Sequence, residues 1–156
     1  MKILTGIALA ALTAGVAFSA PAAAQVRSEI ELTRQQIQTE RQALVTAGME
    51  MTYEQAAKFW PVYREYRAEL APIGDRQVEL IMGYADRFGS VDDDYAQKML
   101  EEHLNIQQAK LEVLRKYVPK FLAVLPAVKV ARFYQIENKL DAVVAFDLAA
   151  SIPVLQ

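Results

Sequence analysis

The chain has no cysteine among its 156 residues. This absence excludes disulfide bonds, thiolate chemistry and zinc or iron–sulfur sites built on cysteine. Histidine occurs once, at position 103, so any triad of the Ser–His kind would depend on His103. Six glycines and six prolines exclude collagen-like or glycine-rich filaments. The 17 basic residues nearly balance the 19 acidic ones, so the chain lacks the excess of positive charge typical of nucleic-acid binding, and no nucleic-acid partner is expected.

Hydrophobic residues make up 53% of the chain, which suffices for the core of one ordinary domain. The hydrophobicity and the net charge of −2 argue against low-complexity disorder.

The first 24 residues have the pattern of a secretory leader. Lys2 supplies a positive start, residues 3–18 are almost wholly apolar, and residues 22–24 form an A-x-A cleavage site before Gln25. The alternative, a membrane anchor, needs about 20 apolar residues, and this run is shorter. Without a lipobox cysteine, lipidation is not expected, and no later stretch is apolar enough to span a bilayer. We expect a cleaved leader at 1–24, a single helical domain at 25–156 and a periplasmic location.

The remaining sequence predicts an all-α fold, because no segment alternates apolar and polar residues for long and no hairpin-turn signal occurs. Four helical segments are expected, at 26–47, 53–88, 92–125 and from 126 onward, followed by an apolar tail at 152–155. The second and third are long, nearly equal and joined by a short link. They predict a bent antiparallel long-helix hairpin with two shorter flanking helices.

Helix ends are signalled clearly at several points. Thr52 and Gln55 have the spacing of a capping box at the start of the second segment. Gly48 is expected to stop the first segment, and Gly89 to end the second. Asp92 is expected to cap the third.

Pro61 and Pro72 interrupt the second segment eleven residues apart, about three turns. They share one face, nearly opposite the apolar stripe, so we expect one continuous helix that bends toward its apolar partner.

Apolar residues at helical spacing predict the core of each segment. The expected core residues are Phe59, Tyr63, Tyr66, Leu70, Ile73, Leu80, Tyr84 and Phe88 in the second segment; Ala96, Leu100, Leu104, Leu111, Leu114, Val118, Phe121, Leu122 and Leu125 in the third; and Val130, Phe133, Tyr134, Leu140, Val143, Val144 and Phe146 in the fourth. Trp60 lies beside the second stripe and is interpreted as part of the core, with the rim of a concave face as the alternative.

The second segment begins MTYEQ at residues 51–55, which resembles the LTxxQ motif of the Spy/CpxP-type periplasmic helical proteins. The resemblance carries over Met51, Thr52 and Gln55, as motif residues with a structural, capping role. It implies a cradle-shaped, often dimeric protein of envelope stress. Members of the family act as ATP-independent chaperones, as modulators of a sensor kinase or as metal-responsive proteins.

No catalytic site is expected, because the sequence has no nucleophile elbow, P-loop, GxGxxG or HExxH motif. No cofactor is expected either. Metal binding is the alternative function: Asp92, Asp93 and Asp94 could attract a hard cation, and His103, Met49 or Met51 a softer one. The acids are explained equally well by the dipole of a helix N-terminus.

A stripe on the first segment is the candidate protein-binding surface. Arg27, Arg34 and Arg41 recur every seven residues beside Ile30, Ile37 and Leu44. Cationic and apolar groups side by side suit a surface that binds many sequences. In the alternative interpretation the arginines pair with acids of this or a neighbouring helix and the apolar residues form a dimer seam.

These patterns together predict a non-enzymatic, stress-associated binding protein of the periplasm, either chaperone-like or a modulator of an envelope sensor. Its expected partners are unfolded or partner proteins of the envelope, and a homodimer is possible. The alternatives are a periplasmic metal-binding protein and a purely structural dimeric module.

Overall fold

The structure of the chain is a computed structural model that describes residues 39–155, apart from the side chains of 147–151. The chain divides into two units between residues 39 and 40, and the description below concerns the second unit together with Thr39. The expected leader and the expected domain start at 25 lie outside the described residues. Across residues 39–155 the chain is helical, with short turns and no strand, which confirms the all-α prediction.

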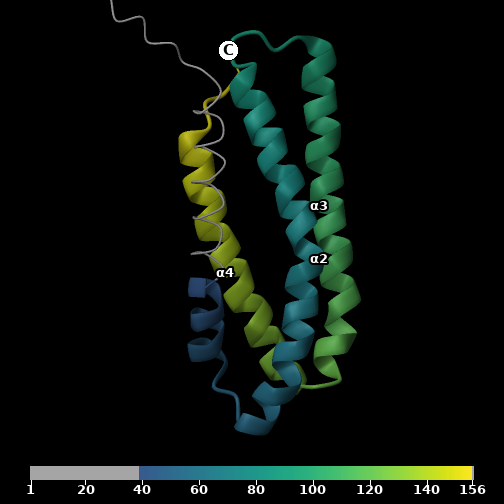
Figure 1. Cartoon of the computed structure of the whole chain (residues 1–156), viewed down its shortest axis with the longest axis vertical. Helices are drawn as coiled ribbons and strands as arrows, with labels where there is room; N and C mark the ends of the chain where they lie inside the picture. Colours follow the sequence, from purple (N-terminus) through teal and green to yellow (C-terminus); the bar gives the residue numbers. More distant parts are fainter. Residues whose placement is uncertain (1–38, 156) are drawn as a thin grey trace, which may run out of the picture. The chain divides into compact units, whose positions relative to one another are not determined.

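The first described residues, 39–49, are helical and are called segment 39–49 below. Three labelled helices follow: α2 (Tyr53–Asp86), α3 (Asp93–Leu122) and α4 (Ala127–Ser151). Figure 1 shows α2 and α3 alongside each other, with α4 returning along the bundle. The predicted segments agree with these helices to within three residues wherever both ends are described.

Capping side chains begin α2 and α3 where the sequence predicts. The Thr52 hydroxyl accepts a hydrogen bond from the Gln55 amide, and the Gln55 side chain accepts one from the Thr52 amide, each at 3.2 Å. Asp92 accepts a hydrogen bond from the Tyr95 amide at 2.8 Å. Gly89 follows α2 with a φ of +82°, the left-handed conformation that favours glycine after a helix.

The stop of the first segment differs from the prediction. Gly48 is still helical, and it is Glu50 that adopts a positive φ of +45°. A methyl group on Gly48 would lie 2.6 Å from Cδ1 of Ile136 on α4. The glycine at this position therefore permits a close approach of α4 and does not reverse the chain.

α2 continues as one helix through Pro61 and Pro72, as expected, and both prolines are exposed. The carbonyl groups that they leave without an amide partner are thus close to solvent. The bend toward the apolar partner stays a prediction.

α2 and α3 run antiparallel. Glu65 pairs with Lys120, Glu69 with Lys116 and Arg76 with Glu102, so later residues of α2 meet earlier residues of α3. These ion pairs lie at the partly exposed border of the helix contact.

The core gathers at one end of the bundle, where α2 begins, α3 ends and α4 begins. Its residues are Val45, Met49, Phe59, Tyr63, Tyr66, Leu70, Tyr117, Phe121, Leu125, Val130 and Phe133. Phe133 is fully buried, and its ring centroid lies 4.7 Å from that of Phe121 and 5.3 Å from that of Phe59. Trp60 is half-buried against Phe59 and Tyr63, which places it in the core and not on an exposed rim.

The other end of the bundle has a thinner core. Among the described residues beyond Leu70 on α2, before Tyr117 on α3 and after Glu137 on α4, only Tyr84 and Ile106 are buried hydrophobic residues. Ile73 and Leu80 are half-buried and Phe88 is exposed, although the sequence places all three in the core. Val143 and Phe146 of α4 are exposed as well.

The apolar tail lies at this end. Tyr84 donates a hydrogen bond from its hydroxyl to the Pro153 carbonyl at 2.8 Å. Phe88, Gly89, Val91 and Leu155 line a small cavity of about 170 Å³. The tail has no helix after residue 151, as expected, but Val154 is left exposed.

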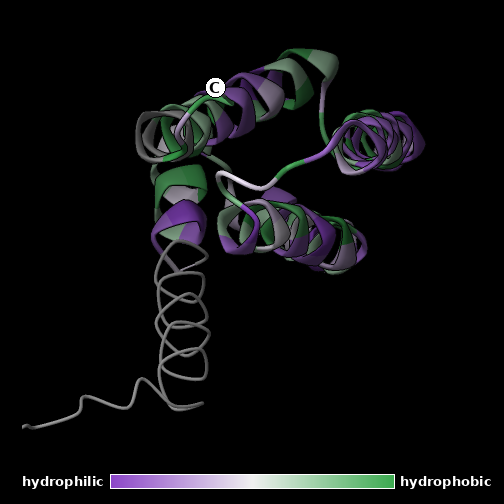
Figure 2. Cartoon of the chain, turned by 90° about the horizontal axis from the view of Figure 1, so that it is seen from above, coloured by the Kyte–Doolittle hydropathy of each residue, from purple (hydrophilic) through white to green (hydrophobic). Residues whose placement is uncertain are grey.

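Figure 2 shows hydrophilic and hydrophobic residues mixed along each helix that it colours. In the part of the chain that the structure describes, no helix is long and apolar enough to cross a membrane.

Candidate functional site

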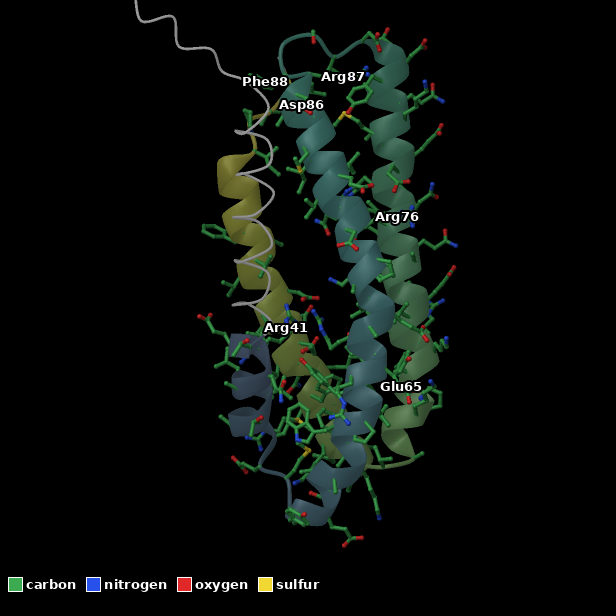
Figure 3. The ribbon with its side chains drawn as sticks, in the orientation of Figure 1. Arg41, Glu65, Arg76, Asp86, Arg87 and Phe88 are labelled. Atoms are coloured by element: carbon green, nitrogen blue, oxygen red, sulfur yellow. The ribbon has the colours of Figure 1, made fainter. Side chains whose placement is uncertain are left out.

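A buried ion cluster joins segment 39–49 to the rest of the bundle. Arg41 donates from Nη1 to Oε2 of Glu137 at 3.0 Å and from Nη2 to Oδ1 of Asp141 at 2.9 Å, both acids belonging to α4. Figure 3 labels Arg41 on segment 39–49, beside α4. Arg67 of α2 lies 3.5 Å from the same Glu137 oxygen, and Lys110 of α3 pairs with Asp141 at 2.6 Å. The side chains of Arg41 and Glu137 are only 6% and 4% exposed.

The pKa values in the cluster follow burial and charge. Burial raises the pKa of Glu137 above its usual range, and the neighbouring Arg41 and Arg67 only partly oppose this. Burial also acts to raise the pKa of Asp141, but the hydrogen bonds and charges of Lys110 and Arg41 outweigh it and lower the pKa. Burial raises the pKa of Tyr63, which lies beside the cluster, to about 12.

Two polar atoms of the cluster have no hydrogen-bond partner among the described residues, Nε of Arg41 and Oε1 of Glu137. Buried charge that is incompletely paired is costly, so this cluster is weak evidence for stability. The cluster instead fixes position, because four helical stretches meet at one pair of acids.

The MTYEQ motif is tied to α4 in addition to capping α2. Nζ of Lys129 donates to the Gln55 side-chain oxygen at 2.9 Å and to the Glu50 carbonyl at 2.7 Å. Arg132 pairs with the Glu50 carboxylate at 2.9 Å. Thr52 and Gln55 thus form the capping box of α2, Gln55 also contacts α4, and Met51 packs half-buried against the core.

The expected core stripe of α3 is largely wrong. Five of its nine residues are exposed, and we call them the α3 apolar stripe: Leu100, Leu104, Leu111, Val118 and Leu122. The buried residues of α3 are Ile106, Tyr117 and Phe121, and of these three only Phe121 was expected in the core. Tyr117 and Phe121 enter the aromatic core, and Glu102, Lys116 and Lys120 pair with α2, which together turn the apolar stripe away from α2.

The α3 apolar stripe stays exposed along its length within the described bundle. Leu100 and Leu104 are 66% and 65% exposed, and the three remaining side chains are between 36% and 46% exposed. Single exposed apolar residues are ordinary, but a stripe along one helix is typical of an interaction surface.

The candidate stripe of the first segment is only partly described. Arg27, Ile30, Arg34 and Ile37 lie outside the described residues. Leu44 is exposed, whereas Arg41 is buried among acids of a neighbouring helix. Arg41 therefore cannot present its charge to a client, because the guanidinium is already enclosed, and it follows the alternative interpretation of paired arginines.

The residues first considered for metal chemistry are placed separately. Asp92 caps α3, and Asp93 and Asp94 occupy its first turn. His103 is exposed in the middle of α3, and Met49 is fully buried in the core. Among the side chains that the structure describes, no group of three or more histidine, aspartate or glutamate residues could hold a metal ion.

Sequence reasoning missed the acids of the buried cluster. Glu137 follows Phe133 by four residues and Val130 by seven, so it occupies a core position of α4. A carboxylate at that spacing is a detectable signal, since a buried acid needs a cationic partner. Asp141, one turn later, lies on the same side of the helix.

Comparison with models of known protein families gives no match, and no curated protein or solved structure matches the chain significantly. The resemblance to the Spy/CpxP-type proteins stays a prediction that rests on the motif.

Proposed function

We propose that this chain is a non-enzymatic binding protein of the periplasm that holds non-native envelope proteins in a chaperone-like manner. The observation that carries the proposal is the α3 apolar stripe, a row of exposed leucine and valine side chains on a continuous helix. The leader pattern of residues 1–24 and the resemblance of residues 51–55 support the compartment and the class.

Such a surface suits a client without defined structure. Apolar contact is non-directional, and its strength scales with the apolar area removed from water, so it does not require one particular client sequence. The stripe runs from Leu100 to Leu122, about 33 Å at ~1.5 Å per residue, which is long enough for an extended segment of about ten residues.

The decisive experiment measures light scattering while an unrelated, chemically unfolded protein is diluted into buffer without nucleotide. The purified exported chain should suppress aggregation at a near-stoichiometric ratio. The double variant Leu104→Gln/Leu111→Gln should need several times more protein for the same effect.

Val128→Gln is the matched control, because Val128 is 81% exposed but belongs to α4 and not to the stripe. All these positions are exposed, so the variants should keep their helicity and stability. No suppression by the parent chain even at large excess, or equal suppression by the double variant and the control, would remove the proposal.

The compartment has its own test. N-terminal sequencing of the protein recovered from the periplasm should begin at Gln25, whereas an intact Met1 on the recovered protein would contradict export by a cleaved leader.

A further inference from the structure

The α3 apolar stripe has a spacing that is the same from either end. Its residues follow one another at intervals of four, seven, seven and four, with Leu111 at the centre. At ~100° per residue all five fall within an arc of about 40° on the helix. This arc is nearly opposite the positions of α3 that pair with α2. A helix with these properties is self-complementary when a second copy is rotated by half a turn about Leu111.

The charge of α3 is also arranged in two opposite halves. Residues 93–107 contain four carboxylates and one lysine, net −3, whereas residues 108–122 contain four cationic side chains and one glutamate, net +3. Glu101, on the stripe side of the first half, and Arg115, on the stripe side of the second, make no ion pair within the described bundle. An antiparallel copy would place acidic half over basic half, and a parallel copy would place like charges together.

We propose that the α3 apolar stripe is covered in solution by the same stripe of a second copy of this chain, with the two α3 helices antiparallel about a two-fold axis at Leu111. Leu111 then contacts its own counterpart, Leu104 faces Val118 of the second copy, and Leu100 faces Leu122. The proposal rests on the proposed function in one respect: the second copy and a non-native client compete for the same stripe.

The size of the contact predicts reversible pairing. A standard stable interface buries roughly 800 Å² on each partner, and a seam along one helix of about 33 Å falls short of that. The dimer should therefore dissociate on dilution, which leaves the stripe open to clients.

The absence of cysteine makes the geometry directly measurable, since an introduced cysteine has no native thiol to compete with it. Leu111→Cys, at the axis, should form a disulfide-linked dimer on mild oxidation. Leu104→Cys alone should not, because two copies of position 104 lie about 21 Å apart along an antiparallel pair. A mixture of Leu104→Cys and Val118→Cys chains should again give the covalent dimer.

Val128→Cys, exposed on α4, is the control for random collision and should form no disulfide-linked dimer. Cross-linking of Leu104→Cys with itself would indicate a parallel pair and overturn the proposed orientation. Failure of Leu111→Cys to cross-link above this control would overturn the proposal. In that case the stripe is either covered by residues 25–38 of the same chain or left open to clients.

Molecular mass measured at a series of concentrations provides the second arm. The parent chain should pass from dimer to monomer on dilution, and Leu111→Glu should be monomeric throughout while it keeps its helicity, because two carboxylates would meet at the axis. A parent chain that is monomeric at every concentration overturns the proposal.

The two proposals fail in different ways. A dimer whose parent chain suppresses no aggregation, even when dilute enough to be monomeric, leaves this inference intact and removes the proposed function. Suppression by a chain that never dimerises does the reverse.

Discussion

Replacing Arg41 by methionine tests the buried ion cluster most directly. Removal of one partner from a buried ion pair costs about 3–5 kcal/mol, because the other charge is left without compensation. Here Arg67 remains 3.5 Å from Glu137, and Asp141, whose side chain is 34% exposed, keeps its pair with Lys110. We therefore expect a loss near the lower limit, about 3 kcal/mol. Methionine preserves most of the apolar contact of the arginine stem.

The assay is urea unfolding followed by circular dichroism. With a slope of ~2 kcal/mol per molar urea, a loss of about 3 kcal/mol moves the midpoint down by about 1.5 M. Lys58→Met is the matched control: its pair with Glu54 is exposed at both ends, 59% and 81%, and its loss should cost less than ~0.5 kcal/mol.

The double variant Arg41→Met/Glu137→Leu should recover much of the loss, because the unpaired acid is removed as well. If Arg41→Met proved as mild as Lys58→Met, segment 39–49 would not be held by the cluster and the structural account given for Arg41 would be wrong.

Three further predictions concern single positions. Thr52→Ala should lower the free energy of unfolding by about 1 kcal/mol through loss of the α2 cap, while Thr46→Ala, inside segment 39–49 and not at a helix start, should not; equal urea midpoints would contradict the capping role. Phe133→Ala should lower the free energy of unfolding by about 3–5 kcal/mol, because it empties the centre of the aromatic core. The control Phe146→Ala, at an exposed position, should lower it by less than ~0.5 kcal/mol. A similar small loss for both variants in thermal melts would place Phe133 outside the core. Burial raises the pKa of Glu137 in the folded chain, so its contribution to stability is complete below the unfolded pKa and is lost as pH rises through the folded one. Glu137→Gln should therefore gain stability relative to the parent chain as pH rises from acid to neutral in urea titrations, and a change of the opposite sign would show that the arginines dominate over burial.

Local signals in the sequence were sufficient for the helix boundaries. The Thr52–Gln55 capping box, the Asp92 cap and the left-handed Gly89 all act within one turn of the residue that carries them, so no distant contact can move them far. Gly48 was interpreted wrongly for the complementary reason: its role depends on Ile136, 88 residues away in the chain.

The candidate site was not predictable to the same degree. The pairing of Arg41 with Glu137 joins positions 96 residues apart, and nothing in the heptad spacing of the arginines identifies the partner. The acid at a core position of α4 was a usable signal, but it indicates only that some cation must meet it.

The sequence alone determines the helical class, the ends of α2 and α3 and the exclusion of cysteine chemistry. Periodicity and caps depend on residues that are neighbours in the chain, and composition needs no structure at all. Only the tertiary structure decided the rotation of α3. That helix has two apolar faces, and the aromatic side chains of Tyr117 and Phe121, together with the ion pairs to α2, bury one of them and leave Leu100, Leu104 and Leu111 exposed. The sequence of a helix with two apolar faces does not by itself determine which face is buried, since that depends on the surface of the element it packs against.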